Sequence, residues 1–288
     1  MLSPDERRLR AGWRILAHFM LLMVFFTGGT LLLVPLSSLL SQYLYLAGQA
    51  VTLIAITLAT FIARRWVDHR SIPSLGLVWN RQAARDLLLG IALPGLQMGL
   101  IFLAEWAFGW LRVESLAWRA IEPLALLREL LVIFLAFVIV GWQEELLSRG
   151  YWLQNLEAGL RLPGALVVSS ILFALGHLLN PNVSVMAILG LTAAGLFLAY
   201  GYLSTRQLWL PIGLHIGWNF FEGPVFGFPV SGLTGFFSLL GVQRSGPELV
   251  TGGAFGPEAG LLQIPALLLV VWIIHRYTRQ RHKKHLLR

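Results

Sequence analysis

The stretch LLVIFLAFVIVGWQEELLSRG, residues 130–150, decides the class of this protein. It begins as an unbroken apolar run and then places Glu144, Glu145 and Arg149 within the same predicted helix. A helix needs about 20 mainly apolar residues to cross a bilayer, and an ionisable side chain in hydrocarbon costs several kcal/mol. Such side chains are usually paired or face a cavity. The stretch therefore predicts a membrane-spanning helix that carries a buried functional site.

The composition of the whole chain agrees with a membrane protein. Of its 288 residues, 57% are hydrophobic and only 12% are charged, and the mean hydropathy is +0.71. Soluble domains carry roughly a quarter charged residues, so a soluble protein is excluded. The chain has no cysteine, which excludes disulfides, thiolate zinc sites and cysteine nucleophiles.

Apolar segments of spanning length recur along the chain, without a soluble domain or a repeat of fixed period. We therefore expect an all-α polytopic protein in which residues 1–288 form a single membrane domain. Eight spans are predicted, at about 13–36, 40–63, 87–111, 128–153, 163–180, 183–204, 208–226 and 259–276.

The net charge of +8 is distributed as expected for a membrane protein. With both termini in the cytoplasm, 18 of the 22 Lys and Arg residues lie on the inner side, as the positive-inside rule requires. The basic groups at the two ends of the chain flank apolar spans. Anionic lipid headgroups explain them better than DNA does, so we expect the lipid bilayer as a partner and no nucleic acid.

The two glutamates of the opening stretch differ in their surroundings. Glu145 and Arg149 are four residues apart, with the acid nearer the amino end, which favours an ion pair within the helix. Glu144 points about 100° away and aligns with Ser148 rather than with a cation, so we expect it to act as a general base. A salt bridge that closes a helix at the membrane boundary is the alternative, but it needs only one glutamate.

Two further helices carry polar groups at helical spacing. His177 follows Phe173 by four residues, and Asn219 follows His215 by four, so each pair shares a helix face. Each pair alone could be a hydrogen-bonding contact between helices. Together with the carboxylates they indicate one buried active site. Glu222 is near the face of His215, and it either lines the site or ends the helix.

Residues 227–258 form the longest predicted segment outside the spans and are rich in Gly, Pro and Ser. At the end of this segment, Pro257 and Glu258 predict a helix start. Proline suits the first helical turn, and a glutamate there interacts favourably with the helix dipole.

The order and spacing of these motifs resemble the CPBP family of intramembrane proteases, also known as the CAAX protease and bacteriocin-processing (Abi) family. The family is marked by a double glutamate followed after three residues by arginine, by Phe-x-x-x-His and by His-x-x-x-Asn. All three motifs are complete here, within residues 140–222. The resemblance places the catalytic core at 125–222, and it extends more weakly to residues 74–77 and 251–258.

The resemblance implies an endopeptidase of the bacterial inner membrane, acting on a peptide or membrane-protein substrate. Glu144, helped by His177, would activate water, while His215 and Asn219 would stabilise the oxyanion. Arg149 and Glu145 would hold the geometry of their helix.

The need for a metal stays open at this stage. Glu144, His177 and His215 would form a zinc-ligand set with an open position. The same residues also suit a metal-free, glutamate-dependent site, because the chain has no His-Glu-x-x-His motif to place two ligands on one helix.

Two other kinds of function compete with the protease. A non-catalytic scaffold or immunity protein could keep the same residues, and a transporter could use them as an ion relay. A transporter of this kind would be expected to have two similar halves with interrupted helices, which the sequence lacks. Other intramembrane proteases are excluded, because the chain has no Gly-x-Ser-Gly motif and no pair of aspartates within the predicted spans.

Overall fold

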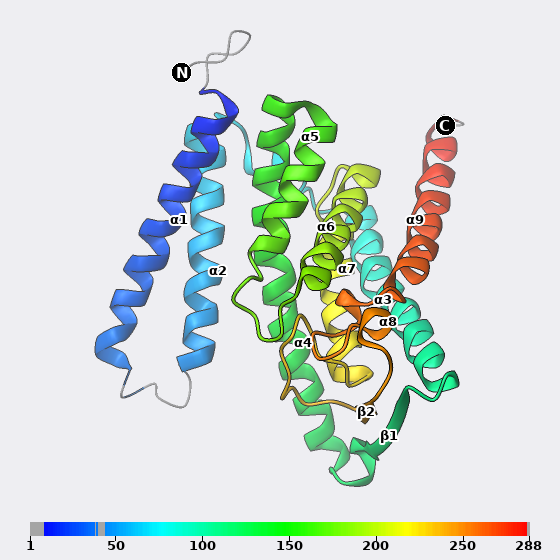
Figure 1. Cartoon of the computed structure of the whole chain (residues 1–288). Coiled ribbons are helices and arrows are strands. Elements are labelled where there is room, and N and C mark those ends of the chain that lie inside the picture. Colours follow the sequence, from blue (N-terminus) through cyan, green and yellow to red (C-terminus); the bar gives the residue numbers. More distant parts are fainter. Residues whose placement is uncertain (1–8, 38, 40–43, 287–288) are drawn as a thin grey trace. The chain divides into compact units, whose positions relative to one another are not determined.

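The computed structural model describes residues 9–37, 39 and 44–286, and it is mostly helical (Figure 1). The main elements are α1 (Ala11–Leu33), α2 (Leu44–Ile62), α3 (Arg81–Ala107), β1 (Leu111–Leu116), α4 (Pro123–Glu145), α5 (Leu153–Leu175), α6 (Val185–Thr205), α7 (Trp209–Phe220), β2 (Leu240–Arg244), α8 (Glu248–Thr251) and α9 (Gln263–Leu286). The predicted all-α polytopic fold is confirmed.

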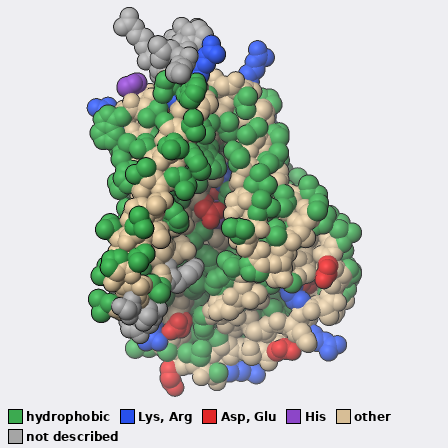
Figure 2. Space-filling view, turned by 60° about the vertical axis from the view of Figure 1, so that its left-hand side comes forward, with side chains coloured by type: hydrophobic (Ala, Val, Ile, Leu, Met, Phe, Trp, Pro, Cys, Tyr) green, Lys and Arg blue, Asp and Glu red, His purple; other side chains and the backbone are tan. Residues whose placement is uncertain are grey.

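Each of the eight predicted spans overlaps a helix. Among the described residues, five helical segments are long and apolar enough to cross a membrane, and one of them, Pro123–Leu175, overlaps two of the predicted spans. Figure 2 shows hydrophobic side chains over much of the visible face. Many large apolar side chains are exposed, as expected where lipid replaces water at the surface.

The chain divides into two compact units, and α4 and α5 contribute residues to both. The first unit consists of Met1–Val78 and Ile139–Ser169, and the second of Trp79–Val138 and Ser170–Arg288.

A buried polar network holds the first unit together. Asp68 follows the π-helical segment η3 (Ala63–Val67) and accepts a hydrogen bond from Nη1 of Arg64 at 3.0 Å. Nη1 of Arg14 lies 3.6 Å from the same carboxylate, and the Tyr151 hydroxyl donates to it at 3.2 Å. The buried charge of Asp68 is thereby compensated, as it must be in an apolar interior. The network links α1 and α2 to the helical segment that follows Glu145.

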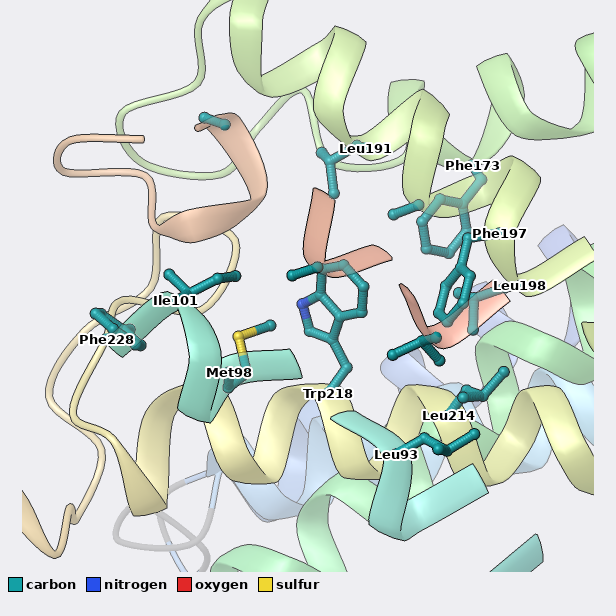
Figure 3. Packing of buried hydrophobic residues seen from close by; sticks show 14 of the residues in the cluster. Leu93, Met98, Ile101, Phe173, Leu191, Phe197, Leu198, Leu214, Trp218 and Phe228 are labelled. Atoms are coloured by element: carbon teal, nitrogen blue, oxygen red, sulfur yellow. The ribbon is translucent and has the colours of Figure 1, made fainter. Parts of the chain in front are cut away.

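The core of the second unit is built from α3, α6, α7 and α9 with the end of α5. Figure 3 shows Trp218 of α7 close to Met98 and Leu191, with Phe173 and Phe197 farther along the same cluster. All five side chains are at most 7% exposed. Burying aromatic and aliphatic side chains in this way stabilises each by roughly 1.5–3 kcal/mol, and it fixes the helices that carry the histidines.

Beyond α3 the second unit contains a two-stranded antiparallel sheet that the sequence analysis did not predict. Residues of β1 pair with β2 from Leu111 opposite Arg244 to Leu116 opposite Leu240, with an irregularity between Val113 and Ser115. The Arg244 guanidinium donates to both carboxylate oxygens of the buried Glu105, at 2.8 and 2.9 Å. This bidentate ion pair ties the sheet to the end of α3.

Two details differ from the prediction. Asp86, expected outside the spans, lies within α3, because the Asn80 side chain caps the helix five residues earlier by accepting from the backbone N–H groups of Gln82 and Ala83. The predicted helix start at Pro257 is a short 3₁₀ segment, η8 (Pro257–Ala259), and the α-helix itself begins at Gln263.

Candidate active site

The two glutamates of the first motif end α4 and belong to the first unit. The next seven residues form a π-helical segment, η6 (Leu146–Trp152), which contains Arg149. Nη1 of Arg149 donates to Oε1 of Glu145 at 2.7 Å, and both side chains are buried. The ion pair predicted from the spacing is therefore present. Segments of π-helix inside longer helices are frequent at functional sites.

Helix α7 of the second unit carries His215 and Asn219, and two glycines fix its position against α3. A Cβ atom on Gly213 would lie 2.3 Å from the carbonyl oxygen of Leu87, and one on Gly217 would lie 2.2 Å from that of Ile91. Only glycine permits this close approach of the two backbones. At about 100° per residue, His215 lies roughly 200° from each of these glycines, so it faces away from the α3 contact.

His177 lies in the turn directly after α5, and its ring is held by the helix end. Nδ1 lies 3.0 Å from the carbonyl oxygen of Phe173. A carbonyl oxygen can only accept, so Nδ1 carries a proton in this hydrogen bond. In the neutral ring Nε2 then has the lone pair, and it can accept a proton or bind a cation. A local backbone contact thus fixes the tautomer of the neutral ring.

The second unit brings the two histidines to the same aromatic ring. The centroid of the Phe173 ring lies 5.1 Å from that of His177 and 6.0 Å from that of His215. His215 and Asn219 are each 6% exposed, so their polar groups act in a largely water-poor environment. Electrostatic interactions are stronger there than in water.

Two more carboxylates lie in this part of the second unit. Glu222 belongs to the π-helical segment η7 (Phe221–Val225), which continues α7, and it is fully buried. It interacts electrostatically with Glu258, which is 4% exposed. Burial raises the pKa of the Glu258 carboxyl, and the positive charges that His177 and His215 can carry, together with hydrogen bonds from Ser231, act in the opposite direction.

Glu258 was not among the residues predicted for the site. Its position after Pro257 indicated a helix start, and its partners are distant in the sequence. The available signal in the sequence was a glutamate within a segment that is otherwise rich in Gly, Pro and Ser.

The predicted site residues thus fall into two groups. The first unit holds Glu144, Glu145 and Arg149, and the second unit brings together His177, His215 and Asn219. Within the described part of the chain, no three His, Asp or Glu side chains are placed to hold a metal ion.

Comparison with known proteins identifies the segment that carries these motifs. Residues 126–221 match the family model described as type II CAAX prenyl endopeptidase Rce1-like. The match covers all three motifs, and the resemblance found in the sequence is confirmed. No curated protein and no solved structure gives a significant match.

Proposed function

We propose that this protein is an intramembrane endopeptidase that hydrolyses a peptide or membrane-protein substrate, because residues 126–221 match the family model of type II CAAX prenyl endopeptidases, Rce1-like. One observation carries the proposal: the double glutamate, both histidines and the asparagine all lie within the matched segment, at the family's spacing.

In the proposed reaction Glu144 and His177 activate water. Glu144 accepts a proton from the water as its oxygen attacks the peptide carbonyl carbon. The proton then passes to the nitrogen of the leaving amine as the C–N bond breaks, which leaves a carboxylic acid and an amine. The hydrogen bond from Nδ1 of His177 to the Phe173 carbonyl supports this role, because it fixes the tautomer and the orientation of the ring.

The negative charge that develops on the carbonyl oxygen needs hydrogen-bond donors. We assign this role to His215 and Asn219, which are one helical turn apart on α7 and both buried. Loss of one such donor typically lowers kcat by about 10²–10³-fold. These donors stabilise the oxyanion well only if they are held rigidly in place. The close contact of the α3 and α7 backbones supports such placement.

Arg149 and Glu145 act on the structure rather than on the substrate in this proposal. Their buried ion pair holds the segment that follows Glu144. If the enzyme uses zinc, Glu144, His177 and His215 are the ligands we propose, and the ion would polarise the bound water. We propose the bacterial inner membrane as the location, with both termini in the cytoplasm.

Peptidase activity tests the proposal. Purified protein in liposomes would be incubated with a library of quenched peptides, comparing wild type with Glu144→Gln. The matched control is Glu114→Gln, which changes an exposed glutamate of β1. We expect the first variant to lose at least about 10²-fold in rate and the control to keep wild-type activity.

A chelator arm, followed by added zinc, decides the metal requirement in the same assay. Equal turnover by wild type and Glu144→Gln would refute Glu144 as the base. If no peptide is cleaved by any variant, membrane-protein substrates become the next library, and specific binding without cleavage would favour a scaffold.

A further inference from the structure

Glu258 makes two hydrogen bonds that its predicted role at a helix start does not explain. Its carboxylate accepts from the backbone N–H of Ser231 at 2.7 Å and from the Ser231 hydroxyl at 2.9 Å. Glu258 therefore binds a loop residue that is 27 positions away along the chain.

Ser231 in turn contacts the turn that carries His177. Its carbonyl oxygen accepts from Nδ2 of Asn180 at 2.8 Å, and the Asn180 backbone N–H donates to the His177 carbonyl at 3.0 Å. The next residue, Gly232, is equally close, because a Cβ there would lie 2.0 Å from the carbonyl oxygen of Pro181. A continuous series of hydrogen bonds thus links Glu258 to the His177 backbone.

Ser231 and Gly232 are the central residues of a tight turn between Val230 and Leu233, whose backbone groups hydrogen-bond to each other in both directions at 2.9 Å. A two-residue turn of this kind requires a positive φ at both central residues. Ser231 has a φ of +48°, in the left-handed region that residues other than glycine rarely adopt. The two hydrogen bonds from Ser231 to Glu258 anchor this turn at its less favourable residue.

Two further contacts hold the backbone carbonyl of Glu258 in place. Its carbonyl oxygen accepts a hydrogen bond from Nε2 of Gln263, at the start of α9. Gly190 of α6 packs so closely that a Cβ there would collide with the same carbonyl. The position of Glu258 is therefore set by α6 and α9, independently of Ser231.

We propose that Glu258 is a positioning residue for His177. It anchors the tight turn at Ser231 and, through Asn180, fixes the turn on which the His177 ring depends. This inference rests on the proposed function for its kinetic consequence, while its structural consequence does not depend on catalysis. Misplacement of a reacting group by about 1 Å can lower the reaction rate about 10²-fold, so a small shift of this turn should lower the rate strongly.

The kinetic test compares Glu258→Gln, Asn180→Ala and the double variant with wild type. Because the two residues belong to one series, each single change should lower kcat by about 10- to 100-fold with KM within about twofold, and the double variant should lose little more than the worse single one. Glu248→Gln, an exposed glutamate of α8, is the matched control and should leave both constants unchanged. Losses that multiply, or a kcat that is unchanged in Glu258→Gln, would overturn the inference.

Hydrogen exchange tests the same link without a substrate. In Glu258→Gln the backbone amides of the turn at residues 176–180 should exchange at least about tenfold faster, while those of α1 and α2 should not change. Ser231→Ala, which keeps the backbone bond, should give a smaller increase and serves if Glu258→Gln folds poorly. Unchanged exchange at this turn in a folded variant would contradict the proposal, whether or not the protein cleaves any peptide. Failure of this inference is thereby distinct from failure of the proposed function.

Discussion

Arg149 and Glu145 place opposite charges 2.7 Å apart with both side chains buried. A second pair, Arg128 and Glu129, has a similar separation of 3.0 Å, but its side chains are 72% and 40% exposed. Removing one partner of a buried pair leaves the other charge without compensation, whereas an exposed charge is compensated by solvent. The two pairs therefore give a matched comparison.

We predict that Arg149→Met lowers the free energy of unfolding by about 3–5 kcal/mol, while Arg128→Met changes it by less than about 1 kcal/mol. Adding Glu145→Gln to Arg149→Met should recover part of the loss, because it removes the unpaired charge. Denaturant unfolding in mild detergent measures both values. Equal losses for the two arginine variants would contradict this account of the pair.

Part of the candidate site could be predicted from the spacing of residues within one helix. The Glu145–Arg149 pair was predicted because side chains four residues apart in a helix face each other, and the structure contains this pair. The role of Glu258 did not follow, because its contacts with Ser231 and the His177 turn join segments far apart in the sequence. Spacing within one helix carries no information about such contacts.

Helix α7 is positioned by glycines rather than by large side chains. Gly213 and Gly217 allow the α3 and α7 backbones to approach closely, and His215 lies between them in the sequence. Any side chain at these glycines would separate the helices and displace the histidine.

We predict that Gly217→Ala destabilises the protein by about 1–3 kcal/mol, because its Cβ would overlap the backbone of Ile91. Gly99→Ala in α3 is the control, since its Cβ would make an ordinary contact of 3.5 Å with Phe226. That change should be neutral or stabilising by up to about 1 kcal/mol, as alanine favours helix. Thermal unfolding of both variants in detergent tests this, and similar midpoints would argue against the close contact.

The helices could be predicted from apolar length, but their irregular segments could not. The segment η6 directly follows Glu145, and η7 begins two residues after Asn219. No local pattern distinguishes π-helix from α-helix there. Pairing of β1 with β2 was also missed, because the two strands are short and separated by more than a hundred residues. Pairing over such a distance depends on the fold around the strands.

For the whole molecule, the distribution of basic residues predicts that both termini and the loops near Ser71 and Arg206 are cytoplasmic. The segments near Glu114 and Thr234 should lie on the opposite side. All four of these residues are exposed, and the chain has no native cysteine to interfere with labelling.

Single-cysteine variants at these four positions test the topology. In intact cells, a membrane-impermeant thiol reagent should label Glu114→Cys and Thr234→Cys but not Ser71→Cys or Arg206→Cys. All four should react after permeabilisation, which controls for reactivity. Labelling of Ser71→Cys or Arg206→Cys in intact cells would require a different number of spans or the opposite orientation.

We propose that Glu144 and His177 activate water together. A double-mutant cycle on these two residues tests this cooperation. Values of kcat/KM would be measured for wild type, Glu144→Gln, His177→Asn and the double variant on one cleaved substrate. Residues that act as a unit give non-additive losses, so each single change should cost about 10²–10⁴-fold and the double variant at most about tenfold more. Losses that multiply, or a single variant with wild-type activity, would contradict the account.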